Sequence, residues 1–221
     1  MSFTKPLLLV AAALLLIAPA RAQDAGEPAL SAADGKLVLD VPEQRLAMPM
    51  PDWLNAGDVG SGDIKPLVDL SYSVENGQIR LDIRPKGETE ADWKIAYGAH
   101  LQEQTSGTLV GFRRSVMAGY GQSCQPNAMA FFQFGRDDGD NLAPLGFACG
   151  AFFDGSGRSF WPWRDRRDEL PQKRQGRCRV LPDWRGPAFD PSKPASWPVA
   201  TNVVEERSRQ LQAEVSLTLA D

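Results

Sequence analysis

The sequence predicts an α+β protein: a mainly antiparallel sheet with one or more helices packed on it, in a single domain after a cleaved signal peptide. Three observations predict this class. Apolar and polar residues alternate in several short stretches, as in strands with one buried face. Residues 108–120 instead place apolar side chains three and four positions apart, as in an amphipathic helix. Seventeen prolines and twenty glycines favour short strands joined by turns over long helices.

The first 22 residues have the composition of an export signal. Lys5 supplies a positive charge, residues 6–17 form an unbroken apolar run, and Ala20 and Ala22 place small side chains at the positions that a signal peptidase reads. The apolar run is shorter than the roughly 20 residues that a transmembrane helix needs. We therefore expect a mature chain that begins near Gln23, a periplasmic or secreted location, and no transmembrane anchor after cleavage.

Composition sets the domain boundaries that we expect. Residues 23–36 lack large apolar side chains, which predicts a flexible arm, and residues 37–221 are long enough for one domain with its own core. The leader holds two of the 24 basic residues and none of the 28 acidic ones, so the mature chain has a formal charge of −6. This balance argues against nucleic acid as a partner.

Strands are predicted first from alternation. Residues 37–41 alternate, and residues 68–74 and 79–83 alternate on either side of Asn76-Gly77, the dipeptide that favours a tight hairpin turn. Pro85 should end the second of these hairpin strands, because proline has no amide hydrogen to donate.

Helices are predicted from capping signals and spacing. Thr89 with Asp92 resembles a capping box and predicts a helix start there. The stretch 108–120 predicts a second helix that either Ser106 or Thr108 could cap, and residues 202–210 predict a polar surface helix.

The second half of the chain is rich in aromatic residues. Residues 128–134 and 145–153 are apolar on both faces, which predicts a hairpin at the centre of the sheet with helices covering it. Residues 154–200 are rich in tryptophan, arginine and proline and predict a long loop region, within which 177–181 form a short strand. Residues 211–219 alternate again and predict a last strand.

Three cysteines remain as disulfide candidates: Cys124, Cys149 and Cys178. In an oxidising compartment one pair should form a bridge and leave one thiol over. Sequence alone leaves three pairings open. We prefer Cys124 with Cys149, because both flank the predicted aromatic hairpin.

The run Pro85, Gly87, Glu88, Thr89 and Trp93, followed by a helix and an aromatic strand pair, resembles a pattern in small exported bacterial proteins with a Mog1/PsbP-like fold. The resemblance implies an antiparallel sheet with helices packed on it. It implies no reaction, because a fold by itself does not carry a function, and it transfers no catalytic residue.

No arrangement of residues predicts catalysis, a metal or a cofactor. His100 is the single histidine, and no serine lies in a nucleophile-elbow motif around which it could act. Asp137, Asp138, Asp140 and Asn141 crowd one predicted turn, but without the spacing of a calcium loop. Acidic residues could still meet in the fold, and an enzyme should then show a pocket that joins several of Asp82, Glu88, Asp92, Asp137 and His100.

The remaining candidate is a surface rich in arginine and tryptophan. These two residue types are enriched where proteins bind partners. We therefore expect an exported, non-catalytic binding or accessory protein whose partner is an acidic protein or a cell-envelope component. The alternatives are a periplasmic hydrolase and a structural envelope protein. The candidate binding residues are Arg158, Trp161, Trp163, Arg164, Arg166, Arg167, Arg177 and Trp184.

Overall fold

The computed structural model describes residues 29–54, 59, 62–89, 92–102, 108–138, 142–153, 159–170 and 174–219. For residues 159–170 and 174–176 it describes the backbone and its pairing. The predicted leader, residues 1–22, lies outside the described residues. Within them, no helix is long and apolar enough to cross a bilayer.

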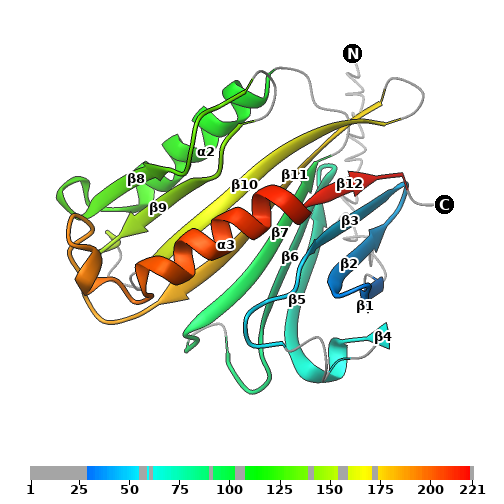
Figure 1. Cartoon of the computed structure of the whole chain (residues 1–221), viewed down its shortest axis with the longest axis horizontal. Helices are drawn as coiled ribbons and strands as arrows, with labels where there is room; N and C mark the ends of the chain where they lie inside the picture. Colours follow the sequence, from blue (N-terminus) through cyan, green and yellow to red (C-terminus); the bar gives the residue numbers. More distant parts are fainter. Residues whose placement is uncertain are drawn as a thin grey trace, which may run out of the picture.

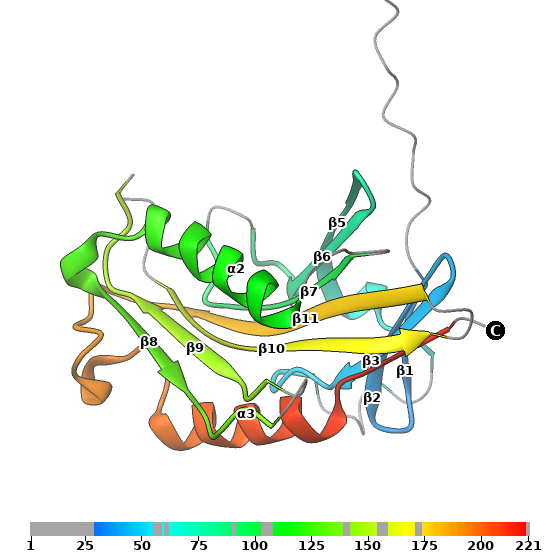
Figure 2. The same cartoon turned by 90° about the horizontal axis from the view of Figure 1, so that it is seen from above.

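The chain folds into two antiparallel sheets and two longer helices (Figure 1). Helix α2 (Leu109–Ser123) lies on one face of the larger sheet, and helix α3 (Thr201–Glu214) lies on the opposite face (Figure 2). The predicted α+β class is thus confirmed. In spatial order the larger sheet contains β5 (Val68–Glu75), β6 (Gln78–Pro85), β7 (Ile95–Gln102), β11 (Arg174–Arg185), β10 (Ser159–Leu170), β9 (Leu145–Cys149) and β8 (Met129–Gln133). The smaller sheet contains β12 (Ser216–Thr218), β3 (Gln44–Pro49), β2 (Lys36–Val41), β1 (Ala29–Ala33) and β4 (Gly62–Asp63). Short 3-10 turns are η1 (Lys65–Leu67), η2 (Pro126–Ala128) and η4 (Pro194–Ser196).

The main core lies between the two sheets, on the face of the larger sheet that also carries α3. Alternating residues of the strands fill it, because every second side chain of a strand points to the same face. Leu211 of α3 and the thiol of Cys178 belong to this core as well. From the larger sheet it takes Ile79, Leu81, Ile83, Tyr97, Ala99, Leu101, Cys178 and Val180.

Two smaller clusters cover the two faces of β9. Phe147 and Cys149 pack with residues of α2 on one face, and Ala148 packs with Trp184, Phe189 and residues of α3 on the other. Helices therefore cover this hairpin on both faces, as its apolar character predicts. Its predicted central position is wrong, however, because β8 forms the edge of the sheet.

The strand and helix predictions from clear periodicity are confirmed. Strands β5 and β6 form the predicted hairpin, with positive φ angles of 51° at Asn76 and 72° at Gly77, and β6 ends at Pro85. Helix α2 begins after Thr108, whose Oγ1 accepts a hydrogen bond of 3.0 Å from the amide of Gly111.

The arm predicted for residues 23–36 is wrong from Ala29 onward. Ala29–Ala33 form β1, which pairs with β2 through a tight turn at Asp34 and Gly35, where φ is 51° and 72°. Leu30 and Ala32 are buried. Because alanine side chains are small, the alternation of this segment was not evident in the sequence. Its pairing with β2 offsets the entropy that the segment loses when it becomes ordered.

The helix predicted at Thr89 is also wrong. Thr89 Oγ1 accepts a hydrogen bond of 3.1 Å from the Asp92 amide, as a cap would, but the chain continues into strand β7. Strand β7 pairs with β6 on one side and β11 on the other, so both edges of its backbone are satisfied. These long-range pairings override the local capping signal.

Residues 154–200 are mostly not a loop, in contrast to the prediction. Residues 159–170 and 174–185 form β10 and β11 in the interior of the larger sheet. Prolines argue against central strands, and here the β10–β11 ladder skips the positions around Pro162 and Pro182 between the pairs Phe160–Trp184 and Arg164–Val180. The sheet therefore tolerates these prolines at a local gap in its hydrogen bonding.

At the C-terminus, the helix predicted at residues 202–210 is confirmed and is longer than predicted. Helix α3 includes residues 211–214, so the predicted strand is limited to β12. The helix is also less exposed than its composition suggests. Val204, Arg207, Ser208 and Leu211 are buried against the sheets.

The disulfide joins Cys124 to Cys149, with a Cα–Cα distance of 5.9 Å, and Cys178 is buried and outside the disulfide. This confirms the preferred pairing. The bridge connects the end of α2 to the end of β9, so it fixes the helix over its face of the sheet.

Candidate binding groove between helix α2 and the larger sheet

Charged side chains occupy the face of the larger sheet that carries α2. In β6, Ile79, Leu81 and Ile83 point into the main core, so Arg80, Asp82 and Arg84 belong to the opposite face. Strand pairing then places Arg80 opposite His100 of β7, and His100 opposite Arg179 of β11. We call Arg80, His100 and Arg179 the cation row.

The cation row places two arginines on one face of the sheet, on the strands either side of β7, with His100 opposite both. Asp82 offsets part of this charge, because its Oδ2 lies 2.6 Å from Nε of Arg80. The guanidinium of Arg179 lies 4.9 Å from the ring centre of Phe112 on α2, a cation–π contact.

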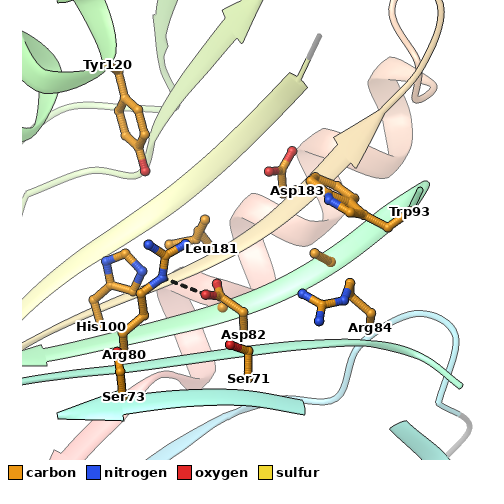
Figure 3. A pocket seen from close by; sticks show the side chains of 12 residues that line it. Ser71, Ser73, Arg80, Asp82, Arg84, Trp93, His100, Tyr120, Leu181 and Asp183 are labelled. Carbon is orange, nitrogen blue, oxygen red and sulfur yellow. Dashed lines mark hydrogen bonds and ion pairs between the residues drawn. The ribbon is translucent and has the colours of Figure 1, made fainter. Parts of the chain in front are cut away.

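A cavity of about 530 Å³ opens on this face (Figure 3). His100, Arg80 and Ser73 lie at one end, and Arg84, Asp183 and Trp93 lie at the other. Its lining contains Ser71, Ser73, Arg80, Asp82, Arg84, Trp93, Ala96, Gly98, His100, Tyr120, Leu181 and Asp183.

A second cavity of about 330 Å³ shares Arg80 and His100 with the first. It lies against α2 and has amide, aromatic and aliphatic side chains in its lining. The two cavities together are called the groove below. The second cavity is lined by Gln78, Ile79, Arg80, His100, Leu101, Gln102, Phe112, Ser115, Val116 and Arg179.

Gly98 forms the floor of the first cavity. A Cβ atom at this position would lie 2.9 Å from Oδ1 of Asp82 and 3.4 Å from the carbonyl oxygen of Leu81. The missing side chain therefore lets the Asp82 carboxylate lie across β7, and it keeps the floor open.

Helix α2 forms the wall of the groove and is fixed at both ends. Near its start, the buried guanidinium of Arg113 donates hydrogen bonds to the carbonyl of Ala143 and, at 3.3 Å, to the carboxylate of Asp137. At its end, Cys124 is held by the disulfide. Tyr120 projects from the helix toward the sheet (Figure 3), with its ring stacked on Phe147 at 5.2 Å.

The far end of the groove combines buried charges with an indole ring. Arg84 and Asp183 are 9% and 8% exposed, so their charged groups are held within the protein rather than in bulk water. The guanidinium of Arg185 lies 4.5 Å from the ring centre of Trp93. Guanidinium groups bind anions, and hydroxyl groups and aromatic rings bind polyhydroxy ligands.

Of the predicted binding residues, Arg177 and Trp184 have side chains that the structure describes, and neither lines the groove. Arg158 lies outside the described residues. Trp161, Trp163, Arg164, Arg166 and Arg167 lie on β10, where Trp161 is paired with Phe147 and Arg164 with Val180. Arg177 and Trp184 are 3% and 7% exposed, so the prediction that both belong to an exposed surface is wrong.

Of the acid and base candidates, the structure brings together Asp82 and His100. Glu88 accepts a hydrogen bond from the Lys94 amide, and Asp137 binds Arg113. Asp92 and Glu88 are not part of either cavity lining. Among the described residues, no group of three or more histidine, cysteine, aspartate or glutamate side chains is placed to hold a metal ion.

Sequence reasoning missed the cation row although part of its signal was visible. The hairpin alternation already puts Arg80, Asp82 and Arg84 on one face of β6, but of these only Asp82 is among the candidate residues named from the sequence. Arg179 lies in the short strand predicted at residues 177–181 and Asp183 in the proline-rich loop predicted after it, and no sequence signal indicated that this segment would pair with β7 beside β6.

Comparisons of the chain with protein-family models, with curated proteins and with solved structures found no match.

Proposed function

We propose that the chain is an exported, non-catalytic binding protein that takes an anionic component of the cell envelope into the groove between α2 and the larger sheet. The observation that carries this proposal is the cation row, in which Arg80, His100 and Arg179 lie side by side on three neighbouring strands. An anion bound over this row would accept charge-assisted hydrogen bonds from the guanidinium groups of the row.

The dimensions of the groove support a small ligand. Its two cavities measure about 530 and 330 Å³, and small-molecule sites measure about 300–1,000 Å³. Export is supported by the composition of residues 1–22 and by the disulfide, since disulfides persist mainly in oxidising compartments.

The test uses the fluorescent anion 8-anilinonaphthalene-1-sulfonate, which carries one sulfonate and aromatic rings. Titration of the folded protein should give saturable binding, with energy transfer from Trp93 at the rim. Arg80→Gln should weaken this binding about tenfold, as expected for the loss of one charge-assisted hydrogen bond.

Arg45→Gln is the matched control. Arg45 is also an exposed strand arginine, and its Nε lies 2.7 Å from a carboxylate oxygen of Asp40, but it lies on the smaller sheet. It should leave binding unchanged. Equal losses in both variants, or the absence of saturable binding, would contradict the proposal and favour a structural envelope protein.

A second candidate is a periplasmic hydrolase, because Asp82, His100, Ser71 and Ser73 line one cavity. Hydrolysis of p-nitrophenyl acetate or p-nitrophenyl phosphate that is abolished by Asp82→Asn would favour this candidate. Binding of the anion without turnover would favour the binding protein.

A further inference from the structure

The groove has two ends of different chemistry that meet at the cation row. One end offers the hydroxyls of Ser71 and Ser73, the Asp183 carboxylate and the face of Trp93. The other end offers the ring of Phe112 and the methyl groups of Val116. Arg80 and His100 line both cavities, whereas Arg84 shares the Trp93 end with the Asp183 carboxylate, so the arginine common to both cavities lies in the middle of the groove.

Building on the proposed function, we infer that the ligand is a phosphodiester that carries its charge between two arms, a polyhydroxy arm in the first cavity and a less polar arm in the second. In the first cavity, the serine hydroxyls and the Asp183 carboxylate can form hydrogen bonds with the hydroxyls of a glycerol or sugar. The indole ring of Trp93 can pack against the C–H groups of the same glycerol or sugar. Phe112 and Val116 suit an acyl chain or another apolar substituent.

Asp82 favours a diester over a monoester. Its carboxylate lies 2.6 Å from Arg80 Nε, so it stands next to any anion bound at the row. A phosphodiester carries one negative charge, whereas a phosphomonoester carries about −1.5 to −2 at neutral pH and is repelled more strongly. A phosphomonoester also has a substituent on only one side of its phosphate. With that phosphate at the cation row, it would fill one cavity and leave the other empty.

Isothermal titration calorimetry can compare glycerophosphoglycerol, glycerol 3-phosphate and inorganic phosphate on the full mature protein. We expect the diester to bind at least about tenfold more tightly than the monoester, and inorganic phosphate to bind most weakly. Lysophosphatidylglycerol below its micellar concentration distinguishes a lipid source from a free head group, since its acyl chain reaches the second cavity.

Ser115→Trp tests that second arm. Ser115 is exposed and lines the second cavity, so an indole there should block it without disturbing the core. The variant should weaken lysophosphatidylglycerol about tenfold and leave glycerol 3-phosphate unchanged. Val110→Trp is the control, because Val110 is exposed on the same helix and belongs to neither cavity lining.

The outcomes separate this inference from the proposed function. Glycerol 3-phosphate could bind as tightly as the diester, and Arg80→Gln could weaken the binding of both. The groove would then bind anions, but the inference that the ligand carries its charge between two arms would be wrong. If the short oligonucleotide tetrathymidylate binds more tightly than glycerophosphoglycerol, nucleic acid replaces the envelope ligand. If no tested anion binds, the proposed function itself fails.

Discussion

The two faces of the larger sheet differ sharply although the same strands form both. On the face toward the smaller sheet, Ile79, Leu81 and Ile83 of β6 are at most 4% exposed and contact only the interior. On the other face, Arg80, Asp82 and Arg84 surround an open cavity. The comparison shows that one face of β6 is packed as core, whereas its other face carries charged groups that line a cavity.

The apolar side contains one buried cation of its own. Arg207 of α3 is 2% exposed, donates a hydrogen bond of 2.7 Å to the carbonyl of Met50 and forms an ion pair with Asp52. Burial lowers the pKa of its guanidinium to about 10, still far above neutral pH. This charge is closed in by hydrogen bonds to the chain, in contrast to the cation row, which lines cavities.

The largest expected effect tests the apolar face. Leu81→Ala should lower the free energy of unfolding by about 2–5 kcal/mol, because it removes a fully buried side chain and leaves a hole between the sheets. Ser73→Ala on the groove face is the control and should change it by less than about 0.5 kcal/mol. Urea unfolding measures both. Similar losses would mean that the two faces contribute alike.

The disulfide gives the next effect and concerns the groove wall. Replacing Cys124 and Cys149 together by alanine should lower the free energy of unfolding by about 2–4 kcal/mol, since the bridge closes a loop across 25 residues. The main core does not contain this bridge. Hydrogen exchange should therefore rise first in α2, β8 and β9. A uniform rise across both sheets would contradict the separation of the two faces.

Much of the apolar face could be predicted from the sequence, because alternation is a local signal. The hairpin of β5 and β6, helix α2 and the disulfide all follow from residues close together in the chain or from a simple choice between pairings. Where the local signal was weak or misleading, as with the alanines of β1 and the cap at Thr89, strand pairing with distant residues decided the structure.

The groove could not be predicted, because it depends on the order of strands in space. Arg80 and Arg179 are about a hundred positions apart, and β7 brings them into one row. The prolines and charges of residues 174–185 concealed a central strand. Such a strand is stable here because Phe112 of α2 covers Arg177 and Arg179 with cation–π contacts of 5.6 and 4.9 Å.

A smaller effect is expected at the floor of the groove. Gly98→Ala places a Cβ 2.9 Å from Oδ1 of Asp82, but this oxygen is the end of a side chain that can rotate away. The free energy of unfolding should therefore change by less than about 1 kcal/mol. A loss as large as that of Leu81→Ala would show that the floor is packed as tightly as the core.

The smallest effect is a pH dependence at the edge of the groove face. Asp69 of β5 accepts hydrogen bonds of 2.8 Å from Lys86 Nζ and 2.6 Å from the Gly87 amide, and these hold the pKa of its carboxyl below the ordinary value of 3.8. A lowered folded-state pKa means that the stabilisation is complete above the unfolded value and is lost as the pH falls through the folded one. Between pH 5 and pH 2 the urea midpoint of the native protein should fall more steeply than that of Asp69→Asn. Parallel curves for the two proteins would show that this carboxylate adds no stability to the hairpin.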